Sequence, residues 1–313
     1  MPAKTVFMFS GQGSQYHQMG RQLYEGNASF RRWMDCLDDL ACGISGRRVI
    51  DAVQAGSKAD VFDRLGLTHP AIFMVEYALA RCLIEAGVEP DVTLGASLGT
   101  FAAAAIAGFI EPEDAMAAVL AQARAFETTC EPGGMIAIMA DPSLHEESWL
   151  GERSEIAGIN FDRHFVVSSP ARELDAIESA LKQRSIVFQR LPVRFAFHSR
   201  WIDRLREPLT AAMSSLRTGP GDLPLACCER GGKVAQLPAD HFWRIVRHPI
   251  RFRDTILDLE RRGPHRYVDV GPSGTLATFA KYALPATTVS STHAILTPYG
   301  QDLKNLDALL ATA

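Results

Sequence analysis

The sequence predicts an α/β protein in which a small subdomain is inserted into a large subdomain built on a parallel sheet. Three observations support this fold class. The chain has 313 residues, more than a single domain usually holds. Strand-like and helical runs alternate over residues 5–131 and again after residue 198, an order typical of a parallel sheet with helices on both faces. Between these parts, residues 133–198 follow the ferredoxin-like (βαββαβ) order.

The first part of the large subdomain is predicted to contain two strands and five helices. One strand is the apolar run Thr5–Phe9, and the other ends at Gly95. A helix starts at Pro112, because proline favours the first helical position and Glu113 and Asp114 suit the first turn. The predicted helices cover residues 19–24, 28–42, 68–86, 100–107 and 112–129.

The small subdomain is predicted to span residues 133–198, and the large subdomain residues 1–132 and 199–313. In the small subdomain, strands are expected at residues 135–139, 155–160, 165–168 and 187–197, and helices at 142–151 and 172–183. The large subdomain resumes with a helical run at 200–215, a turn at 219–221 and strands at 225–229 and 266–270. A cleft between two such units is a preferred place for a substrate.

The composition predicts a soluble, cytoplasmic protein without a metal site. No window approaches 18 consecutive apolar residues, so we expect no membrane span. The N-terminus shows no secretory signal, and the 6 cysteines lack CxxC or zinc spacing, which indicates reduced thiols. The 9 histidines form no metal-binding motif, and a net charge of −4 gives no support for nucleic-acid binding. We also expect a monomer.

The segment Gly95-Ala96-Ser97-Leu98-Gly99 has the pattern Gly-x-Ser-x-Gly between a strand and a helical run. In that context the pattern predicts a nucleophile elbow, in which the glycines permit a tight turn and the serine hydroxyl stands clear of the sheet. Ser97 would then attack a thioester or an ester, and the backbone N–H of Leu98 would receive the oxyanion. The alternative is a Gly-rich turn with an idle serine.

Two other segments carry candidate catalytic groups. In Phe9-Ser10-Gly11-Gln12-Gly13, two glycines permit close approach of the backbone, and the N–H of Gln12 is a candidate second oxyanion donor. This loop lacks the spacing and the lysine of a phosphate loop, and its alternative is an ordinary strand-to-helix turn. His198 is predicted to end an apolar strand and to point into the cleft, although a lone histidine is more often a satisfied core or surface residue.

Taken together, these segments resemble the malonyl-CoA:acyl-carrier-protein transacylase family, the acyltransferases of fatty-acid and polyketide synthesis. The resemblance covers essentially the whole chain. It rests on Phe-x-Gly-Gln-Gly-Ser-Gln at 9–15, Gly-x-Ser-Leu-Gly at 95–99, Phe-His-Ser at 197–199, Asn160, His-Pro-Ile-Arg-Phe at 248–252 and Val-Gly-Pro at 270–272.

The resemblance implies an α/β-hydrolase-like large subdomain and a ping-pong reaction. Ser97 is the implied nucleophile, His198 the general base, and the amides of Gln12 and Leu98 the oxyanion hole. In this family a backbone carbonyl orients the histidine, so no catalytic carboxylate is expected. The implied partner is an acyl carrier protein. Its thioester brings its own phosphopantetheine, and the enzyme needs no further cofactor.

Departures from the family pattern bear on the acyl group. Members that bind malonyl use an arginine on the helix after the elbow, and the matching position here falls on Gln122 or Ala123. Arg124 is one or two residues further on and, at ~100° per residue, would point away from the required face. Burying a carboxylate without its partner costs roughly 3–5 kcal/mol, so malonate should be a poor substrate. Ala96 stands where family members commonly have a histidine, and Thr100 stands where many of them have an acidic residue.

These replacements resemble the stand-alone acyl hydrolases of polyketide synthases that lack built-in acyltransferases. Such enzymes remove acetyl and other short acyl chains from carrier proteins, and water completes their reaction. Two alternatives stay open: a transacylase, which would take malonyl through Arg124, and a non-catalytic docking subunit. The candidate substrate-binding residues are Ala96, Gln122, Asn160, Phe195 and Phe197. Arg247, Arg251 and Arg253 either meet an acidic carrier protein or belong to a solvated helix face.

Overall fold

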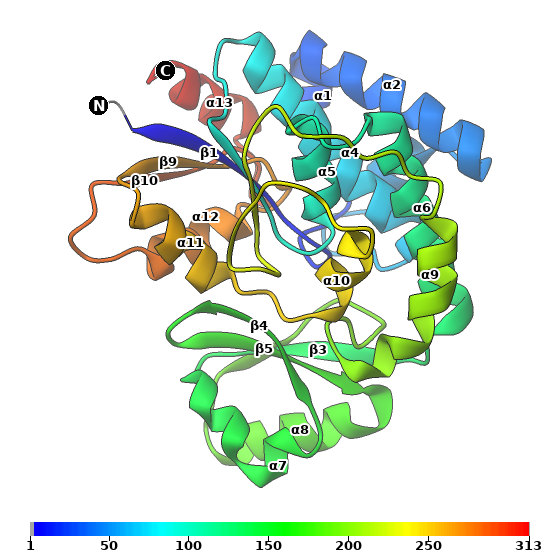
Figure 1. The fold of residues 1–313 in the computed structure, drawn as a ribbon, viewed down its shortest axis with the longest axis vertical. Helices are drawn as coiled ribbons and strands as arrows, with labels where there is room; N and C mark the ends of the chain where they lie inside the picture. Colours follow the sequence, from blue (N-terminus) through cyan, green and yellow to red (C-terminus); the bar gives the residue numbers. More distant parts are fainter. Residues whose placement is uncertain (1–2, 313) are drawn as a thin grey trace.

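A six-stranded sheet forms the centre of the large subdomain in the computed structural model, which describes residues 3–312 (Figure 1). Its order is β10-β9-β1-β2-β7-β8, and each neighbouring pair is parallel except β7 and β8. The strands are β1 (Lys4–Phe9), β2 (Val92–Gly95), β7 (Leu225–Cys227), β8 (Gly232–Val234), β9 (His265–Asp269) and β10 (Ser291–Ala294). The predicted α/β fold with a parallel sheet is confirmed.

Helices cover both faces of this sheet. Those on the first face are α1 (Arg21–Gly26), α2 (Ala28–Ser45), α3 (Val49–Gln54), α4 (Leu65–Glu85), α5 (Gly99–Ile106), α6 (Pro112–Thr129) and α13 (Asp302–Leu310). On the other face lie α11 (Phe252–Glu260) and α12 (Thr275–Ala283). This follows from the alternation in β1, where Phe7 and Phe9 pack with the first set while Val6 and Met8 pack with the second.

The helix α4 is the core helix of the first face. By length and composition it is the one helix within residues 3–312 that is apolar enough to cross a membrane. However, 83% of its most apolar stretch is buried inside the protein, against helices such as α2, α5 and α6. Its apolarity is therefore that of a core element.

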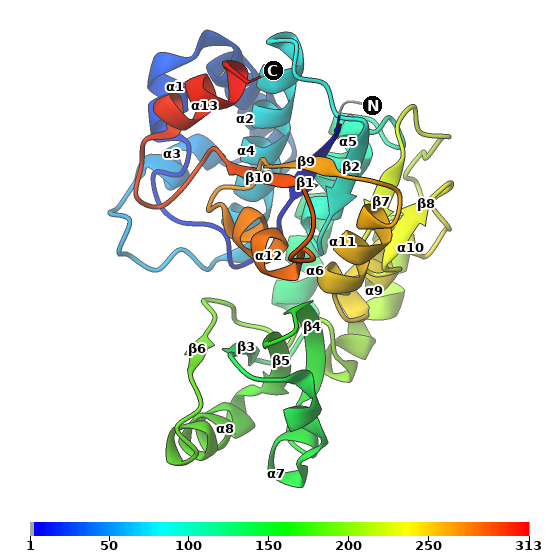
Figure 2. The same ribbon diagram turned by 90° about the vertical axis from the view of Figure 1, so that its left-hand side faces the viewer.

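A four-stranded antiparallel sheet forms the small subdomain, in the order β4-β5-β3-β6 (Figure 2). This is the ferredoxin-like order that the sequence predicts. Its main elements are β3 (Gly133–Ile138), β4 (Glu155–Phe161), β5 (His164–Pro170), α8 (Ala171–Gln183) and β6 (Phe188–Arg190). Ile136 and Ile138 of β3 pack under α8, whereas Met135 and Ala137 pack with Phe197, so the cleft side of the sheet is apolar.

Two predicted elements of the small subdomain are wrong in extent. The helix predicted at 142–151 is a 3-10 turn at Pro142–Glu146 followed by a short helix, α7 (Ser148–Gly151), because Glu147 has an extended backbone between them. The strand predicted at 187–197 ends at Arg190, since Pro192 has no N–H to continue the pairing with β3. His198 therefore lies in an irregular turn, and not at the end of a strand.

After the small subdomain the chain returns to the large one through a 3-10 turn at Arg200–Leu205 and two helices, α9 (Arg206–Ala212) and α10 (His241–Arg247). Figure 2 places α10 on the opposite side of the molecule from β6. The short elements α3, β8 and β10 were not predicted from the sequence.

Candidate active site

A tight turn between β2 and α5 carries Ser97. The φ of Ser97 is 54°, a left-handed conformation that is uncommon outside glycine and is found at strained functional turns. A Cβ on Gly99, where α5 begins, would overlap the carbonyl oxygens of Phe9 and Ser10. Only glycine therefore lets the turn approach the end of β1 this closely.

Replacing Gly99 by Ala is expected to destabilise the protein, because the new methyl group meets two backbone oxygens rather than a flexible side chain. We expect the free energy of unfolding to fall by about 1–3 kcal/mol or more, with loss of activity. Gly43→Ala in α2 is the matched control, since no atom lies within 4 Å of the added Cβ. Alanine there should stabilise the helix by up to about 1 kcal/mol. Thermal unfolding compares the two, and equal melting temperatures would contradict the crowding at Gly99.

His198 lies beside Ser97, with 2.9 Å between Ser97 Oγ and His198 Nε2. The other ring nitrogen, Nδ1, lies 2.8 Å from the carbonyl oxygen of His248. Because a carbonyl only accepts, Nδ1 carries the proton and Nε2 is available to accept the proton of the serine. No carboxylate bonds to this imidazole within residues 3–312. A backbone carbonyl thus orients the histidine, as the family resemblance implies.

The surroundings of His198 keep its ring neutral. The residue is 2% exposed, and its φ is 59°, with its backbone N–H donating to the carbonyl of Val246. Burial lowers the pKa of His198 to about 4, and the positive charge of Arg247 acts in the same direction, while the bond to the His248 carbonyl opposes both. The imidazole is therefore neutral at pH 7, which is the form that a general base requires.

Two backbone N–H groups beside Ser97 are free to bind an oxyanion. Those of Gln12 and Leu98 donate to no acceptor in the described part of the chain. The loop after β1 passes close to the nucleophile, because a Cβ on Gly11 would lie 3.5 Å from Ser97 Oγ. Leu98 directly follows the serine at the positive end of α5. Together these groups can stabilise negative charge on an attacked carbonyl oxygen.

Glu76 of α4 fixes the loop that carries Gln12, a role that was not predicted from the sequence. Its carboxyl oxygen Oε1 accepts from the Ser10 N–H at 2.6 Å and from the Ser10 hydroxyl at 2.8 Å. Burial raises the pKa of Glu76 well above its usual range, although the two Ser10 bonds oppose this. A single carboxylate inside the apolar run Ala71–Ala80 was the available signal.

A cavity of about 760 Å³ adjoins the Ser97–His198 pair between the two subdomains. Its walls are the loop at residues 10–16, the cleft side of the small sheet, and α12. Ala96, Asn160 and Phe197 line it, as do the catalytic candidates Gln12, Ser97 and His198. Within residues 3–312, no group of three His, Cys, Asp or Glu side chains is placed to hold a metal ion.

The other two candidate substrate-binding residues, Gln122 and Phe195, are buried but do not line this cavity. The side-chain oxygen of Gln122 has no hydrogen-bond partner in the described chain. Phe195 packs with its ring 5.7 Å from that of Phe126 and 6.1 Å from that of Phe197. Arg124 is exposed on α6. Among the described residues, no guanidinium lines the cavity.

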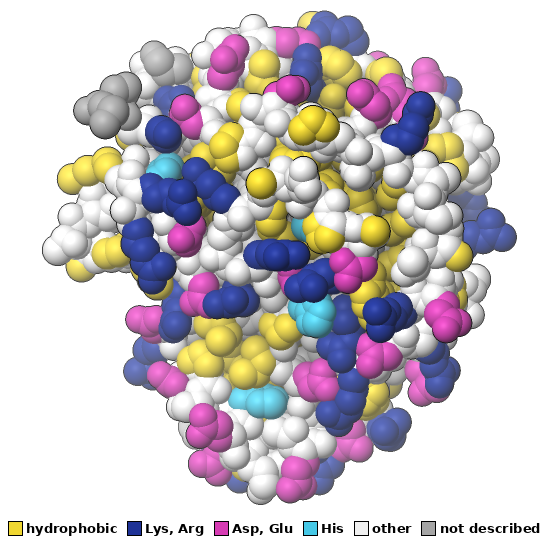
Figure 3. All heavy atoms as spheres, in the orientation of Figure 1, with side chains coloured by type: hydrophobic (Ala, Val, Ile, Leu, Met, Phe, Trp, Pro, Cys, Tyr) yellow, Lys and Arg dark blue, Asp and Glu magenta, His cyan; other side chains and the backbone are white. Residues whose placement is uncertain are grey.

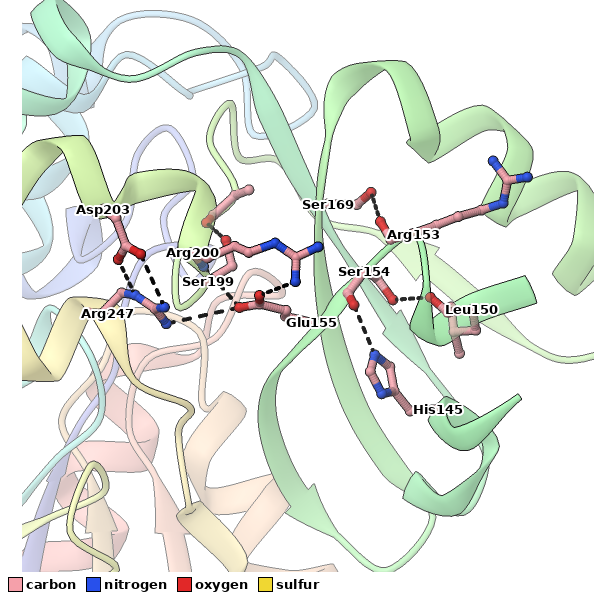
Figure 4. A network of polar contacts seen from close by, with 11 residues as sticks. His145, Leu150, Arg153, Ser154, Glu155, Ser169, Ser199, Arg200, Asp203 and Arg247 are labelled. Carbon is pink, nitrogen blue, oxygen red and sulfur yellow. Dashed lines mark hydrogen bonds and ion pairs between the residues drawn. The ribbon is translucent and has the colours of Figure 1, made fainter. Parts of the chain in front are cut away.

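Each arginine that the sequence suggests for carrier docking is paired with a carboxylate. Arg247 lies 2.5 Å from Asp203 and 3.9 Å from Glu155, in a polar network that also includes Arg200 (Figure 4). The other pairs are Arg251–Asp254 and Arg253–Asp162. Basic and acidic side chains intermingle on the face drawn in Figure 3. Docking of a carrier protein through these arginines stays a prediction.

Comparisons with known proteins are consistent with this geometry. Residues 6–313 match the family described as "Acyl transferase domain". The chain is 44% identical to the polyketide biosynthesis acyltransferase homolog BaeD of Bacillus velezensis and 38% identical to the homolog PksD of Bacillus subtilis, in each case over 99% of this chain and 96% of the relative. A loading acyltransferase from the avermectin modular polyketide synthase is similar with a TM-score of 0.90 and 25% identity, over 98% of this chain and 99% of that one.

Proposed function

The chain belongs to the acyl transferase domain family, whose members are enzymes that act on acyl groups, and we propose that it is an acyl hydrolase. In this proposal it releases short, uncharged acyl groups such as acetyl from acyl carrier protein thioesters, as a proofreading step in polyketide biosynthesis. The relatives named as polyketide biosynthesis acyltransferase homologs support a role in polyketide biosynthesis. The observation that carries the proposal is a serine paired with a neutral histidine beside a cavity that no arginine among residues 3–312 lines.

The first half-reaction acylates Ser97. His198 Nε2 takes the hydroxyl proton as Ser97 Oγ bonds to the thioester carbonyl carbon. The N–H groups of Gln12 and Leu98 donate to the resulting oxyanion. When the carbon–sulfur bond breaks, the sulfur leaves as a thiol with the proton from His198. The phosphopantetheine arm belongs to the substrate, so no separate cofactor takes part.

Water completes the second half-reaction. His198 takes a proton from a water molecule, whose oxygen bonds to the carbonyl carbon of the acyl-serine. Ser97 Oγ then leaves with that proton, and a free carboxylic acid is released. The enzyme returns to its starting state without any net change in its own protonation.

The preference for an uncharged acyl group follows from the missing arginine. Gln122 does not line the cavity, and Lys58, which does, donates to the carbonyl of Pro298. Within residues 3–312, no guanidinium in the lining can pair with a carboxylate. Burying an unpaired carboxylate costs roughly 3–5 kcal/mol, which weakens binding by a factor of several hundred to several thousand. Acetyl carries no such charge, whereas malonyl does.

A second candidate function is acyl transfer, which the names of the relatives favour. It shares the acylation of Ser97 and differs in the acceptor, which is the thiol of a second carrier protein or of coenzyme A rather than water. A non-catalytic docking subunit would not need a hydrogen-bonded Ser97–His198 pair, and this pair argues against it.

A competition assay distinguishes these functions. The protein is incubated with acetyl-loaded or malonyl-loaded carrier protein while an unloaded carrier protein of different mass is present, and mass spectrometry follows both carriers. The hydrolase proposal expects free acid as the main product, formed faster from acetyl than from malonyl. Movement of malonyl to the second carrier would overturn it in favour of transfer.

Gln122 is buried outside the cavity lining, and in Gln122→Arg the longer side chain is expected to extend toward the cavity. We expect it to raise the acceptance of malonyl by about tenfold or more, because a buried carboxylate then meets a partner charge. The measurement is the rate of Ser97 acylation by malonyl-loaded carrier protein relative to the acetyl-loaded form. Arg124→Ala serves as the control, since Arg124 is exposed and its loss should leave the ratio unchanged. If this ratio of malonyl to acetyl acylation rates changes in Arg124→Ala and not in Gln122→Arg, then Arg124 is the residue that binds the malonyl carboxylate.

A further inference from the structure

The turn that carries His198 is held by the small subdomain as well as by the large one. Arg200 contacts Glu155 of β4 twice: its backbone N–H lies 2.9 Å from one carboxylate oxygen, and its guanidinium nitrogen lies 2.8 Å from the other (Figure 4). Before the histidine, the buried hydroxyl of Ser168 on β5 donates to the carbonyl of Phe197. The small subdomain therefore binds the chain on both sides of the general base.

Glu155 and Ser168 act from one place on the small sheet. They are paired directly across β4 and β5, and Ser168 is also paired with Met135 across β5 and β3. Residues that lie directly opposite each other in a sheet share a face. Met135 belongs to the apolar cluster that contains Phe197. The three side chains thus form a row across the cleft side of the sheet, and the turn of the histidine lies against this row.

The strand β4 also holds the carbonyl that orients the imidazole. This carbonyl belongs to His248 and lies 2.8 Å from His198 Nδ1. Two residues further on, the N–H of Ile250 donates to the carbonyl of Ala157 at 2.8 Å, and the carbonyl of Ile250 accepts from the N–H of Ile159 at 2.9 Å. Both segments that meet at the imidazole are therefore bonded to β4.

An ion-pair network joins the same elements. Arg247 lies 2.5 Å from Asp203 and 3.9 Å from Glu155, so one guanidinium links β4 to the 3-10 turn after the histidine (Figure 4). Partly exposed ion pairs contribute little to stability, so the effect of this network is mainly on geometry. The φ of His198, 59°, is a left-handed conformation that persists only where the surrounding contacts hold it.

We propose that Glu155 and Ser168 are positioning residues for the general base: by binding the chain before and after His198, they place Nε2 within reach of Ser97 Oγ. Neither residue lines the cavity, so they act through the histidine and not through the substrate. The seating of the small subdomain on the large one thereby sets the geometry of the catalytic pair. The proposal rests on the proposed function in one respect, that His198 is the base that activates Ser97.

The test follows the reaction of Ser97 with a small fluorophosphonate, which requires the base but no carrier protein. Ser97 Oγ bonds to phosphorus, fluoride leaves, and His198 takes the hydroxyl proton. In Glu155→Ala we expect the labelling rate to fall roughly 10- to 100-fold, since a displacement of about 1 Å at a reacting group has an effect of this size. Glu155→Gln keeps an oxygen that accepts from the backbone N–H, and it should retain the rate within about threefold.

Ser168→Ala removes the contact on the other side of the histidine. We expect its labelling rate to fall roughly 3- to 10-fold, as loss of one hydrogen bond implies. Glu173→Ala is the matched control, because the side chains of Glu173 and Glu155 are both 25% exposed and both pair with an arginine, but the partner of Glu173 is Arg153 of the small subdomain. It should retain the unaltered rate.

A double mutant separates positioning from a general structural role. With His198 already replaced by alanine, Glu155→Ala should change the remaining rate by less than about twofold, because the residue that it positions is absent. An equal fall with and without His198 would assign Glu155 a structural role and overturn the proposal. An unaltered labelling rate in either single variant would also overturn it. Where Glu155→Ala does not fold, Ser168→Ala in the same two backgrounds decides the question.

Acetyl-loaded carrier protein separates this inference from the proposed function. If the unaltered protein reacts with the fluorophosphonate but forms no acetyl-serine, the proposed function is contradicted, and the labelling rates of the variants still decide the inference. If the unaltered protein does not react with the fluorophosphonate at all, His198 does not activate Ser97 and both are overturned.

Discussion

Ser97→Ala is expected to reduce the release of acetate from acetyl-loaded carrier protein by about 10⁴-fold or more, because the covalent route then has no nucleophile. The oxyanion amides and the cavity remain, so substrate binding should persist. Intact-protein mass spectrometry provides the direct measurement: the unaltered protein gains the mass of one acetyl group after rapid mixing and acid quenching, and the variant gains none.

The control for this variant is Ser179→Ala on α8, an exposed serine that bonds only to the carbonyl of Asp175. It should retain the unaltered rate and the acetyl adduct. Adduct formation in Ser97→Ala would place the nucleophile elsewhere and refute the mechanism. A full in vivo activity of Ser97→Ala would favour the docking-subunit alternative.

His198→Ala is expected to lower the acylation rate by about 10²–10⁴-fold, the usual range for loss of a general base. The structural reason is that Nε2 is the atom placed to take the serine proton, at 2.9 Å from Oγ. Single-turnover acylation measured by rapid quenching reports this step separately from release of the acid. His145→Ala, on the small subdomain outside the cavity, is the matched histidine control.

The pH dependence of the unaltered protein tests the same residue. The neutral imidazole is the active form, so acylation rises with pH through the pKa of His198 and is flat above it. With that pKa lowered to about 4, the rate should already be near its plateau at pH 6. A histidine at the ordinary value of 6.5 would have lost more than half of its activity there. A midpoint near 6.5 would contradict the burial that the structure shows.

The parts of this protein that short-range patterns govern could be predicted from the sequence. The helix α6 begins at Pro112 and ends at Thr129 as expected, because proline and two acidic residues mark its start. The tight turn that carries Ser97 could be predicted because a nucleophile elbow is a local pattern. The parallel sheet could be predicted because strand-like and helical runs alternate along the chain, and topology rules allow few arrangements for that order.

The remainder depends on contacts between distant residues. His248 orients His198 through a backbone carbonyl, which no side-chain pattern records. Glu76 reaches Ser10 across 66 residues. The strand β6 is a different case, because Pro192 is a local signal that ends it at Arg190, and the apolar alternation at 187–197 outweighed that signal in the prediction.

The carbonyl that steadies His198 has a kinetic consequence. Within residues 3–312 a protonated ring at this place has no carboxylate partner, and the neighbouring Arg247 repels it. Such an imidazolium readily gives its proton to the departing group, which is a thiol when Ser97 is acylated and the Ser97 hydroxyl when the ester is hydrolysed. A thiol is the better leaving group, so we expect the acyl-serine to form faster than it is hydrolysed and to accumulate during turnover.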